Sequence, residues 1–114
     1  MIFFTKGNWN RFFTHNKKTT IRFHHVMEGL HSAGSGSRLS GTYKHLGKVI
    51  IGKAVEPEGK FVKDLTEHDA MDDGFDSLEE LMKELSIIKF STPITPETLG
   101  WRYPAVVAEG NRCV

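Results

Sequence analysis

A short basic stretch, residues 16–23, carries side chains that could bind an anion or attack a carbonyl group. It reads N-K-K-T-T-I-R-F, with two threonines, one arginine and two lysines in eight residues. Because side chains alternate between the two faces of an extended strand, Ile21 and Phe23 are expected to face a core. Thr20 and Arg22 then face the other side, where a hydroxyl, a guanidinium and nearby amines would form an anion or carbonyl site. A half-buried strand whose polar residues face solvent explains the same letters.

The flanking patterns predict the elements that would hold this strand. An apolar run at residues 2–5 predicts an opening strand, and Trp9, Phe12 and Phe13 follow at the spacing of one helical face. The glycine- and serine-rich stretch 29–37 predicts a flexible loop, which either closes over a ligand or has no role. Further strands are predicted at residues 38–43, 48–55, 60–65 and 103–109.

Two short helices are predicted in the middle of the chain. Thr66 is a good helix N-cap, and Asp69 stands where a capping box needs an acidic residue. Gly74 ends that helix. A second capping box starts the next helix, whose apolar face is lined by Leu78, Leu81, Met82 and Leu85.

Together these elements predict an α+β fold, a small mixed β-barrel of five or six strands with two or three short helices. At 114 residues, the chain is expected to be a single domain spanning 1–114. The lone Cys113 excludes an internal disulfide, and no window is long and apolar enough for a membrane span. We therefore expect a cytoplasmic protein that does not bind a membrane.

Charge is distributed unevenly along the chain. Residues 1–57 hold nine Lys or Arg and two acidic residues, a net charge of +7, whereas residues 58–114 carry −6. This asymmetry predicts a positive face for a polyanion beneath an acidic helical cover, although acidic residues also simply solvate helices. The three histidines at positions 24, 25 and 31 do not complete a zinc set, so no metal and no cofactor is expected.

Two segments resemble a known family. The strand K-K-T-T-I-R at residues 17–22 resembles the signature of the ASCH domains, which are relatives of the PUA RNA-binding fold. Residues 65–75, L-T-E-H-D-A-M-D-D-G-F, are similar to the helix that follows the barrel strands in that family, and a leucine-bearing helix follows here as well. The resemblance implies a β-barrel with a basic cleft that binds RNA, a nucleotide or a modified nucleoside.

The resemblance also implies roles for individual residues. In the binding hypothesis, phosphate is contacted by Lys17, Lys18, Arg22 and Arg38. Some small bacterial members of the family are amidohydrolases that deacetylate N4-acetylcytidine, and their lysine, threonine and acid fall on Lys17, Thr20 and Asp73. The family has a glutamate where this chain has Asp73, which shortens the acid by one methylene.

The chemistry of such a site is coherent. A threonine hydroxyl needs a base to attack an amide, and Lys17, crowded by the charges of Lys18 and Arg22, could accept its proton. Asp73 could protonate the departing amine. Binding of RNA or a nucleotide is the first hypothesis and N4-acetylcytidine deacetylation the alternative. A protein-interaction module whose acidic helices contact a partner is a third.

Overall fold

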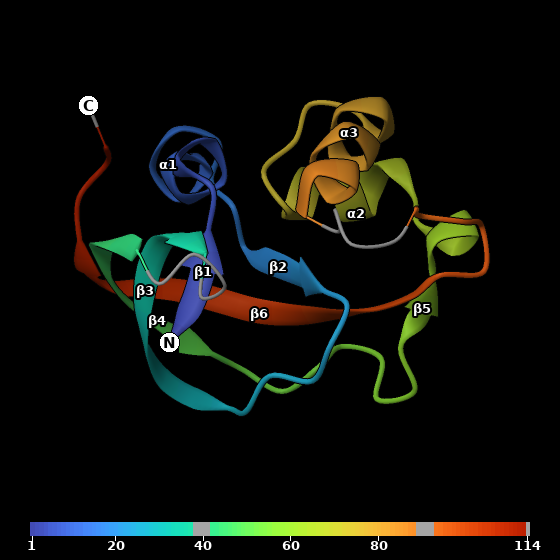
Figure 1. Cartoon of the computed structure of the whole chain (residues 1–114). Coiled ribbons are helices and arrows are strands. Elements are labelled where there is room, and N and C mark those ends of the chain that lie inside the picture. Colours follow the sequence, from blue (N-terminus) through green and yellow to red (C-terminus); the bar gives the residue numbers. More distant parts are fainter. Residues whose placement is uncertain (38–41, 89–92, 114) are drawn as a thin grey trace.

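The computed structural model of the protein describes residues 1–37, 42–88 and 93–113. Within these ranges it contains six strands and three α-helices (Figure 1). The strands are β1 (Ile2–Phe4), β2 (Thr19–Arg22), β3 (Gly29–Ser37), β4 (Thr42–Ile51), β5 (Lys60–Phe61) and β6 (Leu99–Gly110). The helices are α1 (Lys6–Thr14), α2 (Glu67–Asp72) and α3 (Leu78–Ile88), and a short 3-10 helix spans Val62–Asp64.

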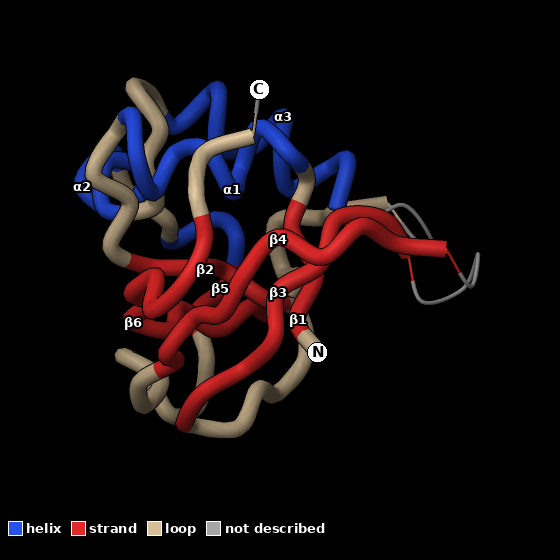
Figure 2. The backbone as a smooth tube through the Cα atoms, turned by 90° about the vertical axis from the view of Figure 1, so that its left-hand side faces the viewer, coloured by secondary structure: helices blue, strands red, loops and turns tan. Residues whose placement is uncertain are grey.

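The strands form one curled, mixed sheet in the order β1-β3-β4-β6-β2, and β5 also pairs with β6. β1 and β3 are parallel, whereas the other neighbours are antiparallel. The helices gather on one side of the sheet (Figures 1 and 2). The predicted α+β fold with a barrel-like sheet is therefore confirmed.

The predicted aromatic helix is α1, and it covers the first core cluster. Its N-cap is Thr5, whose hydroxyl accepts a hydrogen bond from the backbone N–H of Asn8 at 3.1 Å. Trp9 is fully buried, and its ring lies edge-on to the Phe4 ring of β1. This cluster holds Ile2, Phe4, Trp9, Ala33, Leu46, Val49, Ile51, Tyr103 and Ala105.

The predicted capping box at the start of α2 is present. Thr66 Oγ1 accepts from the Asp69 N–H at 3.1 Å, and Asp69 Oδ2 accepts from the Thr66 N–H at 3.0 Å. Gly74, at φ +87°, follows the end of the helix as predicted. The second core cluster lies beneath α2 and α3, where Leu81 and Leu85 are almost fully buried. No helix in the described part of the chain is long and apolar enough to span a membrane.

The prediction of a flexible loop at residues 29–37 is wrong, because this stretch is the strand β3 between β1 and β4. Small residues are needed there. Ala33 is fully buried, and a Cβ on Gly34 would lie 2.9 Å from the sulfur of Met1 and 3.3 Å from the Tyr43 ring. Glycine at position 34 therefore permits close packing of β3 against its neighbours in the sheet.

The turn predicted between strands at 38–43 and 48–55 is also wrong. One strand, β4, runs through the expected turn, and residues 38–41 lie outside the described residues. Gly47 suggested that turn, but a Cβ at this position would lie 2.0 Å from the backbone oxygen of Glu109 on β6. The glycine therefore allows β4 and β6 to approach. The strand expected at 60–65 is reduced to β5 followed by the 3-10 helix.

Candidate functional site

The basic stretch forms β2, an end strand of the sheet whose four residues are all buried. Ile21 belongs to the second core cluster, beneath the helices. The Thr19 hydroxyl bonds Asp73, which follows α2, whereas Arg22 bonds Phe3 on β1. β2 therefore has one face toward the helices and one toward β1. Neither faces solvent, so the solvent-exposed alternative is wrong.

On the helix side, Lys17 and Asp73 form a buried ion pair. Lys17 Nζ lies 3.0 Å from Asp73 Oδ2, and it also donates a hydrogen bond of 3.0 Å to the backbone oxygen of Asp73. The Thr19 hydroxyl donates to the other carboxylate oxygen at 3.2 Å. Lys17 and Asp73 are only 4% and 2% exposed, so solvent does not screen this pair.

Burial changes the acid–base behaviour of this pair. Desolvation lowers the pKa of Lys17, although the neighbouring Asp73 acts in the opposite direction. Desolvation likewise raises the pKa of Asp73 against the effect of Lys17. The rings of Phe12 and Phe75 lie 5.6 and 6.0 Å from Lys17 Nζ, which contributes to this apolar environment. Both shifts favour uncharged groups, so Lys17 is a candidate proton acceptor.

On the opposite face, Arg22 is held by three contacts and has one unpaired nitrogen. Nε donates to Thr20 Oγ1 at 3.1 Å, Nη1 donates to Phe3 O at 2.6 Å, and the guanidinium lies 4.6 Å from the Phe4 ring centre. Nη2 is buried and has no hydrogen-bond partner among the described residues. Desolvation lowers the pKa of Arg22 to about 10, which keeps the group charged at neutral pH. A ligand acceptor placed near Nη2 would satisfy this donor.

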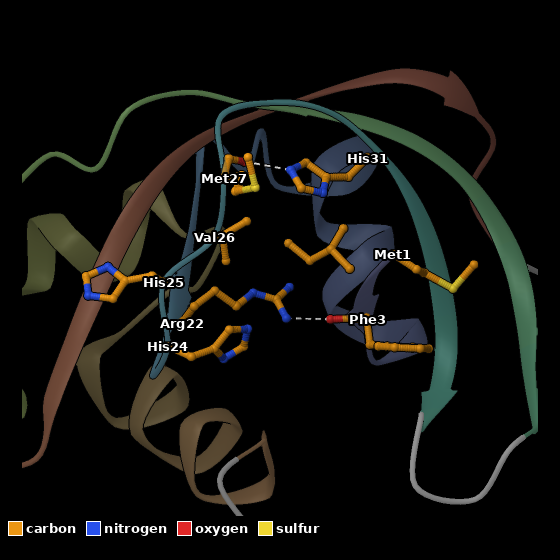
Figure 3. A pocket seen from close by; sticks show the side chains of 9 residues that line it. Met1, Phe3, Arg22, His24, His25, Val26, Met27 and His31 are labelled. Carbon is orange, nitrogen blue, oxygen red and sulfur yellow. Dashed lines mark hydrogen bonds between the residues drawn. The ribbon is translucent and has the colours of Figure 1, made fainter.

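A cavity of about 430 Å³ lies beside Arg22, between the end strands of the sheet (Figure 3). Its volume is within the range of small-molecule sites, about 300–1,000 Å³. The Arg22 guanidinium points into the cavity, with His24 close by and His31 on the opposite wall. The ring of His25, which also belongs to the lining, lies against Trp101 with the ring centres 4.4 Å apart.

The predicted catalytic residues fall into two groups. Lys17 and Asp73 lie together on the helix side, whereas Thr20 is bonded to Arg22. Thr20 is 1% exposed, and no hydrogen bond or ion pair in the described ranges joins it to Lys17 or Asp73. Lys17 and Thr20 are close in sequence, but the structure does not arrange the three residues as a hydrogen-bonded triad.

The predicted phosphate-binding residues are spread more widely. Arg22 lines the large cavity, whereas Lys17 and Lys18 line a second cavity of about 330 Å³ between α1 and β6. Lys18 is exposed. Arg38 lies outside the described residues. The binding roles of these four residues stay predictions.

Three residues of the two sites are missing from the sequence-based prediction. Thr19 lies two residues after Lys17, so strand alternation was a usable signal that both face Asp73. His31 had no such signal. His24 lines the cavity because it follows Arg22 by two residues, whereas His31 lies on β3 and reaches the cavity because β3 pairs with β1. This pairing cannot be read from the glycine-rich stretch.

No protein-family model matches the sequence, and no curated protein matches it. In fold, the chain is similar to the crystal structure of protein EF3133 from Enterococcus faecalis V583, described with the family model DUF984. The two share 14% sequence identity at a TM-score of 0.52, over 82% of this chain. The aligned part is 62% of the length of the Enterococcus protein. This similarity shows a shared barrel-like fold.

Proposed function

We propose that this protein is an ASCH-like module that binds a nucleotide or a modified nucleoside, free or within RNA, in the cavity beside Arg22. The unpaired Nη2 of Arg22 carries the proposal. A buried charged donor without a partner is costly, and natural proteins keep few of them. A ligand that accepts a hydrogen bond from Nη2 would remove this cost. The cavity volume is adequate for a nucleoside.

The contact between the two ASCH-like segments supports the proposal. Lys17 and Asp73 come one from each segment and pair 56 residues apart in the sequence. The backbone of Lys18 also donates to the backbone oxygen of Asp72 at 2.7 Å. Arg11 Nη1, on α1, donates to the backbone oxygen of Gly74 at 2.8 Å. The two segments that carry the resemblance are thus joined directly to each other, and the first of them includes β2, the strand that lines the cavity.

The proposal predicts that replacing Arg22 with methionine weakens ligand binding. Methionine keeps an apolar stem but removes the donor, and hydrogen bonds to charged groups contribute about 1.5–3 kcal/mol. We expect about 10- to 100-fold weaker binding of cytidine 5′-monophosphate and of a short single-stranded RNA, measured by titration calorimetry. Binding of the RNA should also weaken with salt, with a log–log slope of roughly −0.7 per phosphate contact.

Arg112→Met is the matched control, because it removes the same charge from an exposed position outside the cavity. It should change the affinity for the mononucleotide little. Thermal unfolding of both variants would show whether the fold is retained, and Arg22→Lys tests charge without the guanidinium. Absence of binding by the unaltered protein, or equal affinities of Arg22→Met and Arg112→Met, would overturn the proposal.

Deacetylation of an N4-acetylcytidine-like nucleoside is the second candidate function, favoured by the desolvated amine of Lys17. In the structure the Thr20 hydroxyl and the Lys17 amine lie on opposite sides of β2, so this hypothesis requires a rearrangement on substrate binding that brings them together. The hydroxyl then loses its proton to the amine and attacks the amide carbonyl. Asp73, whose pKa is raised by burial, protonates the departing amine. Water then hydrolyses the acetyl ester on Thr20, which releases acetate and restores the hydroxyl. The Arg22 guanidinium, already bonded to Thr20, stabilises the oxyanion.

This hypothesis predicts that the protein converts N4-acetylcytidine to cytidine and acetate, which chromatography would detect. Thr20→Val keeps the side-chain shape and removes the nucleophile, so turnover should fall by more than about 100-fold. Thr14→Val, at an exposed position on α1, is the control and should retain activity. If no cytidine forms, or if Thr20→Val turns over equally fast, the second function is excluded.

A further inference from the structure

We propose, building on the function proposed above, that an uncharged edge of the ligand, and not a phosphate group, occupies the cavity beside Arg22. A carbonyl oxygen of the ligand accepts from Arg22 Nη2, and an N–H of the ligand donates to His31 Nδ1. The cavity would then recognise a nucleobase or an acylated amine. Phosphate groups would remain outside it.

The contacts of Arg22 favour a single acceptor. Arginine binds phosphate best through two parallel N–H groups on one edge of the guanidinium. Here Nε is occupied by Thr20 Oγ1 and Nη1 by Phe3 O, so Nη2 is the nitrogen left without a partner among the described residues. A phosphate bound at the edge formed by Nε and Nη2 would compete with Thr20 for Nε, whereas a single carbonyl oxygen needs Nη2 alone.

The hydrogen bond of His31 defines what the opposite wall offers. His31 Nε2 lies 2.6 Å from the backbone oxygen of Met27. A carbonyl oxygen can only accept, so Nε2 carries the proton. In the neutral ring Nδ1 is then an acceptor, and Figure 3 shows this nitrogen directed into the cavity. An anionic oxygen at this position would meet a lone pair, whereas an N–H of a ligand would be bonded.

The remaining walls fit a flat, weakly polar group. Val26 and Met27 lie between Arg22 and His31 in Figure 3, and Ile2 is a further apolar residue of the lining. Apolar surroundings penalise a phosphate dianion and favour an aromatic ring whose polar atoms lie at its edge. The cavity therefore combines a donor, an acceptor and apolar faces, which is the complement of a nucleobase that carries both a carbonyl and an N–H group.

Competition for bound cytidine 5′-monophosphate tests this inference. The competitors are the ribonucleosides cytidine, uridine and guanosine, which lack a phosphate, and ribose 5-phosphate, which lacks a base. We expect at least one nucleoside to compete and ribose 5-phosphate not to compete. In His31→Phe, which keeps a ring but loses the acceptor, affinity for that nucleoside should fall about 3- to 10-fold. His45→Phe, at an exposed position on β4 outside the cavity, is the matched control and should bind as the unaltered protein does.

The other possible results exclude either this inference alone or the proposed function together with it. If cytidine 5′-monophosphate binds through Arg22 but ribose 5-phosphate competes and the nucleosides do not, the inference is wrong and the proposed function stands. The same holds if His31→Phe and His45→Phe bind the nucleoside equally. If no nucleotide or nucleoside binds at all, the proposed function fails and the inference fails with it. Thermal unfolding of both histidine variants would identify a loss that arises from misfolding.

Discussion

Asp73→Ala is expected to destabilise the fold by about 3–5 kcal/mol, because it leaves the amine of Lys17 buried without its partner. The variant also removes the acceptor of the Thr19 hydroxyl. The free energy of unfolding from urea denaturation measures this effect. The neighbouring Asp72→Ala is the control, since Asp72 is half-buried and its ion pair is with the exposed His68. Its cost should be within about 1 kcal/mol.

A double replacement separates the net contribution of the ion pair to the free energy of unfolding from the destabilisation caused by removing one partner. In Lys17→Met with Asp73→Leu, both charges are removed and apolar volume is retained, so most of the lost stability should return. Recovery would mean that the ion pair is kept for a reason other than stability, such as proton transfer or ligand binding. If Asp73→Ala alone lowers the free energy of unfolding by less than about 1 kcal/mol, Lys17 does not need the Asp73 carboxylate for stability, and the prediction is wrong.

Trp9→Ala should cost a similar amount, about 3–5 kcal/mol, since the indole is fully buried between the sheet and α1. The indole N–H also donates to the backbone oxygen of Asn111 at 2.9 Å, which fastens the segment after β6 to the helix. Trp9→Phe keeps much of the packing and loses this hydrogen bond, with an expected cost of about 1–2 kcal/mol. Thermal or urea unfolding would give both values.

Phe13→Ala provides the comparison, because Phe13 lies on the same helix but is 42% exposed. It should destabilise the protein much less than Trp9→Ala. If both variants lower the free energy of unfolding equally, the outer face of α1 contributes as much as the buried Trp9, and the prediction is wrong.

The parts of this fold that depend on local rules could be predicted from the sequence. The spacing of Trp9 and its neighbouring aromatics fixes α1, and Thr66 with Asp69 fixes the start of α2. The basic strand follows from its alternation. These elements are specified by residues a few positions apart, so the sequence alone carries enough information for them.

The parts that depend on distant residues could not be predicted in this way. Gly34 and Gly47 look like loop residues, but they lie inside strands. Glycine is required at these positions because Met1, Tyr43 and Glu109 approach them closely. The same limit applies to the candidate site. That Lys17 would meet an acid followed from the resemblance alone, and the cavity follows from strand pairings that no short pattern records.

The junction between β1 and β2 has a consequence for access to the interior. These strands end the sheet order, and Arg22 bonds across them to Phe3 O, while no backbone hydrogen bond in the described ranges joins them. Separating two hydrogen-bonded strands breaks several backbone hydrogen bonds together. β1 and β2 are instead joined by one charge-assisted hydrogen bond, of about 1.5–3 kcal/mol, and by the packing of Arg22 on the Phe4 ring. A ligand acceptor at the unpaired Nη2 of Arg22 leaves that bond in place. The curled sheet can thus bind a ligand between its two end strands without separating any pair of hydrogen-bonded strands.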